Sequence, residues 1–206
     1  MPEKPNIVLD LDLTLICSCS KEEDEKYKIS NPDIKKKIKK FRRKNMDNYY
    51  MVFERPGLQS FLSFLFKNFN VSIWTAASKD YALFIIEHII LNGKKNRIID
   101  WIFFSYHCDI SKRIKKGTKD LSILWKEYKI PQFSRKNTVI IDDYDEVYKT
   151  QPENCISISP FNFTDEGSEG DKHLLNLKEE LKNMSKHIQS GKEKPAKEVN
   201  KKLKAR

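Results

Sequence analysis

Two closely spaced pairs of aspartates follow apolar runs and could carry chemistry. Asp10 and Asp12 come after residues 6–9 (NIVL), and Asp142 and Asp143 end the run T-V-I-I-D-D. A carboxylate can attack an electrophilic centre or transfer a proton, and several carboxylates held together need a cation to offset their repulsion. The sequence places no cluster of His or Cys with them, which favours an oxygen-binding metal over zinc. The spacing therefore predicts a Mg²⁺ site.

The first pair also has a simpler interpretation. In the run D-L-D-L-T-L, Asp10, Asp12 and Thr14 could be the solvated side of an amphipathic strand. The unbroken apolar run before Asp10 argues against this, because a strand with one solvated face alternates from its start. The second acidic pair, after another apolar run, argues in the same direction. We therefore favour the metal site.

The elements that must position these groups are short apolar runs that alternate with helical patterns. The expected strands cover residues 6–9, 49–53, 71–76, 98–104, 138–142 and 155–159. The expected helices cover residues 58–69, 79–92, 119–129 and 171–189. This alternation predicts an α/β fold with a mainly parallel central sheet, and the uninterrupted apolar strands indicate helices on both faces. Ligands bind at the carboxyl ends of strands in such sheets, which is where the aspartates and Thr75 fall.

Further short segments follow the first aspartates along the chain. They are R-P-G at 55–57, W-T-A-A at 74–77, K-D-L-S at 119–122, V-I-I-D-D at 139–143, Q-P-E-N at 151–154 and D-K-H-L-L-N-L-K-E-E-L at 171–181. Together with D-L-D-L-T-L they resemble the motifs of FCP/SCP-like phosphatases in the haloacid dehalogenase (HAD) superfamily, which act on the C-terminal domain (CTD) of RNA polymerase II. The resemblance covers about residues 5–181. It implies a Rossmann-like HAD fold with a small insertion instead of a large cap domain.

The resemblance also implies a reaction. The expected enzyme is a Mg²⁺-dependent protein serine/threonine phosphatase, a phosphoric monoester hydrolase that works through an aspartyl-phosphate intermediate. Asp10 would attack phosphorus, and Asp12 would protonate the leaving oxygen and then activate water. Thr75, Ala76 and Lys119 would bind the phosphoryl group.

The metal ligands are implied in the same way. Asp10, the backbone carbonyl of Asp12 and Asp143 would hold Mg²⁺, with Asp142 as a further acidic group beside them. The resemblance leaves the division of roles between Asp142 and Asp143 open.

The charge of the chain is concentrated toward its end. Residues 182–206 hold nine Lys or Arg and two Glu, a net charge of +7 within a total of +10. This segment has few large apolar residues, so we expect a phosphatase domain over residues 1–181 and a basic, disordered tail over 182–206. The tail could instead be an electrostatic arm for nucleic acid or an acidic partner.

A second charged stretch lies within the expected domain. Residues 17–48 contain K-E-E-D-E-K at 21–26 and eight basic side chains at 35–44. We expect a charged surface loop here, which is either a solvated face or a basic rim for a phosphate-rich ligand.

Several classes of protein are excluded by composition. No apolar run approaches the roughly 18 residues of a membrane span, and no signal-peptide core is present. Four cysteines in 206 residues, without zinc-finger spacing, do not predict a disulfide scaffold or a zinc site. We expect an intracellular protein of the cytoplasm or nucleus, with no membrane association.

Two other functions remain open. A polynucleotide 3′-phosphatase on the same HAD scaffold would suit the net charge of +10 and the basic tail. A non-catalytic module that binds phosphorylated tails is the third hypothesis, although every expected catalytic residue is present. The first hypothesis predicts a phosphorylated protein as the partner, with the RNA polymerase II tail as one candidate.

Overall fold

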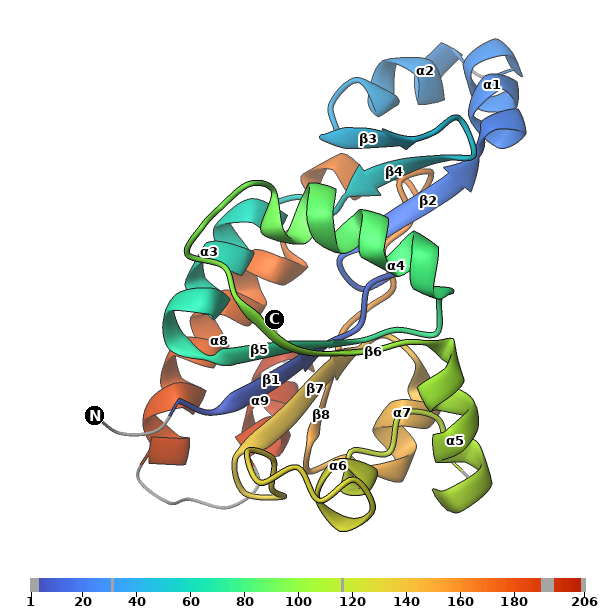
Figure 1. The fold of residues 1–206 in the computed structure, drawn as a ribbon. Coiled ribbons are helices and arrows are strands. Elements are labelled where there is room, and N and C mark those ends of the chain that lie inside the picture. Colours follow the sequence, from blue (N-terminus) through green and yellow to red (C-terminus); the bar gives the residue numbers. More distant parts are fainter. Residues whose placement is uncertain (1–3, 31, 116, 190–194, 205–206) are drawn as a thin grey trace.

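A five-stranded parallel sheet forms the centre of the molecule. The structure is a computed structural model that describes residues 4–30, 32–115, 117–189 and 195–204. The strand order is β6-β5-β1-β7-β8, and every neighbouring pair is parallel (Figure 1). The strands are β1 (Asn6–Leu9), β5 (Asn70–Trp74), β6 (Ile99–Phe103), β7 (Thr138–Asp142) and β8 (Cys155–Ser157). The predicted α/β fold with a mainly parallel sheet is confirmed.

Helices cover both faces of this sheet, which explains why its strands read as unbroken apolar runs. The side chains of Ile7 and Leu9 lie in one core, while that of Val8 between them lies in another. The first core includes residues of α3 (Leu58–Asn68), α4 (Lys79–Ile85) and α8 (His173–Gln189). The second includes residues of α5 (Ser105–Lys115), α6 (Ser122–Lys126) and α7 (Asp145–Thr150). All four side chains of β1 are therefore buried.

The helix expected over residues 79–92 changes its winding halfway. α4 continues into the π-helix η1 (Ile86–Leu91), which ends where Asn92 and Gly93 adopt positive φ. Two side chains from elsewhere bind carbonyls of η1: Gln59 donates to that of Ile89, and buried Arg97 donates to that of Ile90. Ile89 and Ile90 lie in the last turn of the helix, where carbonyls lack intrahelical donors, so these two side chains satisfy them.

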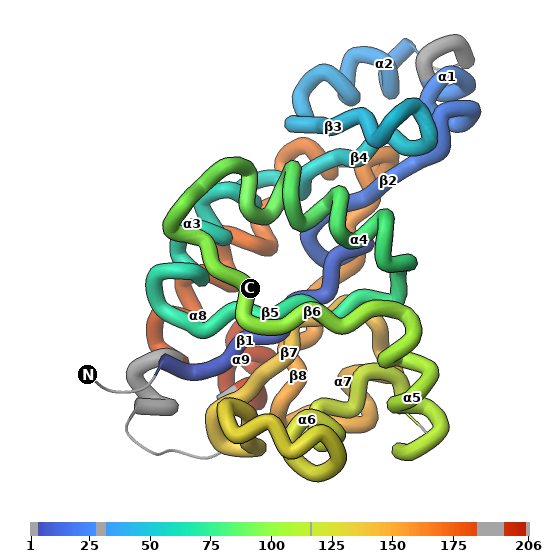
Figure 2. Tube along the Cα trace, in the orientation of Figure 1, coloured from blue at the N-terminus to red at the C-terminus, as the bar shows by residue number. Residues whose placement is uncertain are grey.

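The charged stretch at 17–48 forms a small insertion rather than the expected surface loop. It contains α1 (Lys21–Ser30) and α2 (Pro32–Ile38), and β2 (Ile16–Ser20) and β3 (Arg43–Met46) join β4 (Tyr50–Glu54) in an antiparallel sheet of order β2-β4-β3. Figure 2 shows this insertion projecting beyond α4, away from the central sheet. The expectation of a loop failed because Phe41 and Phe53 pack against Phe161 and Phe163, which lie more than a hundred positions later.

The C-terminal segment also differs from the expected disordered tail. α8 runs through the expected boundary at 181, and α9 (Pro195–Lys204) follows, whereas residues 190–194 and 205–206 lie outside the described residues. A short 3₁₀-helix, η2 (Ser168–Gly170), precedes α8. Ala196 and Val199 are buried at helical spacing. Asn200 accepts from the amide of Ser157 at 3.0 Å and donates to the carbonyl of Cys155 at 2.8 Å, so it covers the outer edge of β8.

None of the helices within the described ranges is both long enough and apolar enough to cross a membrane.

Candidate active site at the carboxyl edge of the sheet

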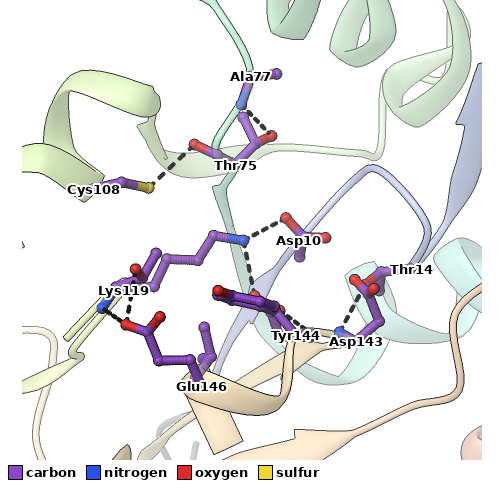
Figure 3. A network of polar contacts seen from close by, with 12 residues as sticks. Asp10, Thr14, Thr75, Ala77, Cys108, Lys119, Asp143, Tyr144 and Glu146 are labelled. Carbon is purple, nitrogen blue, oxygen red and sulfur yellow. Dashed lines mark hydrogen bonds and ion pairs between the residues drawn. The ribbon is translucent and has the colours of Figure 1, made fainter.

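The chain leaves β1 at Asp10 and turns back toward β7. Leu13, at the tip of the turn, has a positive φ of 59°. Thr14 joins the turn to the end of β7, because its hydroxyl donates to Asp143 Oδ1 at 2.9 Å and accepts from the Asp143 amide at 3.1 Å. The carboxylates of Asp10 and Asp143, far apart in the sequence, are thereby brought to one edge of the sheet (Figure 3).

The buried side chain of Arg55 also supports this turn. Its guanidinium donates to the carbonyls of Thr14 at 3.0 Å and Ser159 at 2.9 Å, and to the carboxylate of Asp171 at 2.9 Å. Burial raises the pKa of Asp171, but the hydrogen bond and charge of Arg55 outweigh it and hold that pKa below its usual range. The R-P-G arginine is therefore a structural cation that ties the first turn to the start of α8.

The side chain of Asp12 points to α4. Tyr81 donates its hydroxyl to Asp12 Oδ1 at 2.6 Å, and the Tyr81 and Ser18 hydroxyls are 2.9 Å apart. Burial raises the pKa of Asp12 to about 6; the charge of Asp10 acts in the same direction and the Tyr81 hydrogen bond opposes it. The pKa of Asp12 therefore lies near the neutral range, in which a carboxyl group can both give and take a proton.

Lys119 is buried between two of the carboxylates. Its ammonium lies 2.5 Å from Asp10 Oδ1 and 2.8 Å from Asp142 Oδ2 (Figure 3). Burial by itself would lower the pKa of Lys119, but the charges and hydrogen bonds of Asp10 and Asp142 reverse this and raise it above its usual value. The raised pKa keeps Lys119 positively charged at neutral pH.

The backbone around Lys119 is held by Gln151. Lys119 has a positive φ of 54°, a conformation that costs free energy for any residue with a side chain. Gln151 donates to the carbonyl of Lys119 at 2.7 Å and accepts from the amide of Leu121 at 3.0 Å. The side chain of Gln151 thus bonds the backbone at Lys119 and at Leu121, and so holds Lys119 at its positive φ.

Two more side chains hold the residues before and after Lys119. Glu146 of α7 accepts from the amide of Thr118 at 3.0 Å and from its hydroxyl at 3.1 Å. Ser111 of α5 donates to the carbonyl of Gly117 at 2.7 Å and accepts from the amide of Asp120 at 2.9 Å. The lysine turn is therefore fixed by polar groups of α5, α7 and the segment after α7.

Asp10, Asp142 and Asp143 form the acidic cluster of the site. One carboxylate oxygen of each lies within 4.8 Å of the others. Burial, and after it the charge of Asp10, raises the pKa of Asp142 to about 7 and also raises that of Asp143. Among the described residues, Lys119 is the cation that bonds to this cluster. One ammonium cannot balance the negative charge of three carboxylates. The donor set, three oxygen anions short of positive charge, fits a hard divalent cation.

Thr75 lies at the same edge, after β5. Its hydroxyl accepts from the Ala77 amide at 3.1 Å, and within the described part of the chain no acceptor takes its hydroxyl proton. That proton is available to a phosphoryl oxygen. Ala76, between them, is exposed in the turn.

Four of the seven predicted site residues thus lie in contact or close together in the structure, and the other three lie near this group. Asp10, Asp142, Asp143 and Lys119 form one group, while Thr75 and Ala76 follow β5 and the carboxylate of Asp12 faces Tyr81. Sequence reasoning missed the roles of Tyr81, Glu146 and Gln151. For Gln151 the signal was its place in Q-P-E-N; for Tyr81 and Glu146 we find none.

Comparison with known proteins supports a phosphatase family. A family model described as NLI interacting factor-like phosphatase matches residues 5–191. A putative CTD phosphatase-like protein of Invertebrate iridescent virus 6 is 46% identical over 179 residues, which make up 85% of this chain and 96% of that protein. A protein with the same description from Invertebrate iridescent virus 3 is 40% identical over 184 residues, covering 87% of this chain and 96% of the relative.

The fold is also found among solved structures. The structure of Fcp1, described as an essential RNA polymerase II CTD phosphatase, superposes with a TM-score of 0.58 at 19% identity. The superposition covers 98% of this chain and 62% of that one, so the chain spans less than two thirds of the Fcp1 structure. This likeness concerns the fold and confirms the predicted Rossmann-like HAD architecture. The motifs, the family match and the viral relatives agree with the predicted FCP/SCP-like resemblance, and the chain belongs to the NLI interacting factor-like phosphatases, a family of phosphoric monoester hydrolases.

Proposed function

We propose that this chain is a Mg²⁺-dependent protein serine/threonine phosphatase that forms an aspartyl-phosphate on Asp10. One observation carries the proposal: a buried lysine bonded to two aspartates, one of which directly follows the central strand of the sheet. The bond to Lys119 orients the Asp10 carboxylate, the group that would act as the nucleophile. It also offers positive charge to the incoming phosphoryl group.

The acidic cluster is the proposed metal site. Asp10, Asp143 and the backbone carbonyl of Asp12 would hold Mg²⁺, while Asp142 is engaged by Lys119. Asp142 also accepts from the Tyr144 amide at 2.8 Å, so both of its oxygens already have partners. When bound, the metal supplies positive charge that offsets the carboxylates and the phosphoryl oxygens.

In the first chemical step, a carboxylate oxygen of Asp10 attacks phosphorus. A bond forms between that oxygen and phosphorus while the bond from phosphorus to the leaving oxygen breaks, and Asp12 gives its proton to the leaving oxygen. The raised pKa of Asp12, about 6, supports this role. Thr75 and Lys119 donate hydrogen bonds to the phosphoryl oxygens, and each fixed donor of this kind supplies about 3–4 kcal/mol at a transition state.

In the second step, water attacks the phosphorus of the aspartyl-phosphate. Asp12, now ionised, takes the proton of that water, the bond between Asp10 and phosphorus breaks, and inorganic phosphate leaves. Both carboxyl groups return to their starting protonation states. The contact between Tyr81 and Asp12 holds the same carboxyl group in place for both proton transfers.

A phosphorylated protein is the proposed substrate. The viral relatives are described as CTD phosphatase-like, and Fcp1 as a phosphatase of the RNA polymerase II CTD. The insertion between β1 and α3 is small and does not form a large cap domain. A polypeptide segment can therefore reach the site, and the phosphorylated RNA polymerase II tail is the first candidate.

The decisive experiment measures phosphate release from an aryl phosphate. Wild type should turn over with Mg²⁺ and stop when EDTA removes the metal. Asp10→Asn should lose at least about 10⁴-fold in kcat, because the nucleophile is gone. Asp80→Asn, an exposed aspartate on α4, is the matched control and should keep full activity. Turnover by Asp10→Asn, or turnover that EDTA leaves unchanged, would contradict the mechanism.

The polynucleotide 3′-phosphatase hypothesis stays open for the same site. Exposed basic residues of the insertion, namely Lys35, Lys36, Lys39, Arg43 and Lys44, make no ion pair within the described ranges. Such residues could contact a phosphate backbone. Release of a 3′-phosphate from an oligonucleotide, faster than from a phosphopeptide at equal concentration, would favour this alternative.

A further inference from the structure

A cavity of about 540 Å³ opens beside the acidic cluster. Asp143 lines it on the side of the proposed reaction centre, and residues 157–160, from the end of β8 onward, form part of its wall. Lys172 just before α8, Asn176 in the first turn of α8 and Lys204 in the last turn of α9 also line it. The cavity therefore runs from the site to the C-terminal helix.

The cations of this cavity are free to bind an anion. Lys172 and Lys204 are exposed, and neither forms an ion pair within the part of the chain that the structure describes. Lys204 lies 5.8 Å from the centre of the Tyr148 ring, which holds the last turn of α9 near α7. By contrast, the acid Asp145 has a partner in Lys149 at 3.6 Å.

The end of the cavity near Asp143 is acidic, whereas the end bounded by α8 and α9 is basic. An anion is repelled at the first end unless a metal is bound, and it is attracted at the second. Asn176 also lines the cavity, and no described residue bonds its side-chain amide. A dianion could therefore meet two ammonium groups and an amide donor in one place.

We propose that this cavity binds a second phosphorylated side chain of the same polypeptide, a few residues from the phosphate that Asp10 attacks. The inference rests on the proposed function and names a preference for multiply phosphorylated segments. α9 lies beyond residues 5–191, which the family model matches, so Lys204 is a feature of this chain outside that match. A nucleic-acid backbone fits less well, because the basic residues lie at one end of the cavity and Asp143 lies at the other.

The experiment compares kcat/KM on matched phosphopeptides. One peptide carries a single phosphoserine, and the others add a second phosphoserine roughly two to four residues away on either side, distances that an extended chain covers at about 3.3 Å per residue. We expect wild type to favour one doubly phosphorylated peptide by about fivefold to tenfold, mainly through KM, since each charged hydrogen bond contributes modestly. The preference should fall as salt rises.

Substitutions in the cavity test which residues cause the preference for the doubly phosphorylated peptide. Lys204→Ala and Lys172→Ala should each reduce it, and the double variant should bring it within about twofold of unity. Lys201→Ala is the matched control, because Lys201 is exposed on α9 and does not line the cavity. All variants should hydrolyse an aryl phosphate at the wild-type rate.

Several outcomes would overturn the inference. One is equal kcat/KM for the singly and doubly phosphorylated peptides. Another is a preference that survives the double variant, and a third is an equal rate when glutamate replaces the second phosphoserine. A Lys204-dependent rate on 3′-phosphorylated oligonucleotides, with none on the peptides, would assign the cavity to nucleic acid instead.

A separate measurement distinguishes failure of the cavity from failure of the enzyme. If wild type does not hydrolyse aryl phosphate, the proposed function is wrong, and binding of fluorescent peptides to the Mg²⁺-loaded protein then tests the cavity alone. Tighter binding of the doubly phosphorylated peptide, lost in the Lys172/Lys204 double variant, would support the cavity. Equal binding of both peptides would contradict it.

Discussion

Two turns carry the proposed catalytic groups, and they are supported in opposite ways. Each contains a residue with side chain at positive φ, Leu13 in the first turn and Lys119 in the second. The first turn continues the buried central strand β1 and rests on the guanidinium of Arg55. The second turn follows no strand and is held by the side chains of three residues from other segments, Ser111, Glu146 and Gln151.

The difference indicates how each turn should fail. Arg55 is buried and bonded to segments from three parts of the chain, so damage to the first turn should destabilise the whole fold. The supports of the second turn are partly buried polar bonds to the backbone of a short loop. Damage there should displace Lys119 and reduce activity while the fold remains stable.

The largest expected effect is on stability, through the first turn. Arg55→Met removes one buried cation and leaves the carbonyls of Thr14 and Ser159 and the carboxylate of Asp171 without it. We expect the free energy of unfolding to fall by about 3–5 kcal/mol, measured by urea denaturation. Arg113→Met, on the exposed face of α5, is the control and should change it little. A stable Arg55→Met protein would show that the first turn does not depend on this cation.

The next effect is on activity, through the second turn. Lys119→Met should lower kcat by about 10²–10³-fold, because in the proposed mechanism its ammonium meets the phosphoryl group. The comparison is with Lys67→Met, an exposed lysine at the end of α3. Aryl phosphate hydrolysis measures both variants. If kcat of Lys119→Met fell by less than about tenfold, Lys119 would have no direct part in the chemical step.

The first turn also predicts a pH dependence. Arg55 holds the pKa of Asp171 below its unfolded value, so the ion pair stabilises the protein above the unfolded pKa. That stabilisation is lost as the pH falls through the folded pKa. Asp171→Asn should therefore cost about 2 kcal/mol at pH 7, and the difference from wild type should vanish in strong acid. Urea denaturation at several pH values measures it, and a constant gap in acid would contradict the assignment.

The smallest expected effect is on the activity of Gln151 variants, and it tests whether the two turns fail differently. Gln151→Ala leaves the Lys119 carbonyl and the Leu121 amide without their partner and should lower kcat about tenfold, because a catalytic group is misplaced. Gln151→Glu keeps the acceptor for Leu121 and should lose less. KM and the midpoint of thermal unfolding should stay near wild type for both variants. A fall in stability as large as that of Arg55→Met would erase the distinction between the turns.

The central sheet could be predicted because the sequence of each buried strand is itself a short apolar run. Residues 7–9 and 139–141 are unbroken apolar runs, and the structure has β1 and β7 over the expected ranges 6–9 and 138–142. The aspartates after them could be placed at one edge because parallel strands share a direction. The contacts of Lys119 could be expected only from the resemblance, since the loop that carries it has no periodic pattern.

The helices α1 and α2 of the insertion and the C-terminal helix α9 could not be predicted from the residues, for a physical reason. Their apolar residues are few and become buried only against partners remote in sequence, as Phe41 does against Phe161. The polar side chain of Asn200 likewise finds its partners far away in sequence, at the edge of β8. Composition reports the average polarity of such a segment and not the one face that packs. Tyr81 escaped notice similarly, because its contact with Asp12 depends on how α4 lies over the first turn.

The reach of Arg55 has a consequence for synthesis on the ribosome. Its partner Thr14 is already made when Arg55 emerges, but Asp171 follows 116 residues later. At about 5–20 residues per second, translation takes on the order of ten seconds to supply that carboxylate. Until then the guanidinium lacks its counterion and remains in water, because burying an unpaired charge is too costly. The turn that carries Asp10, the proposed nucleophile, is therefore completed only when the start of α8 leaves the exit tunnel.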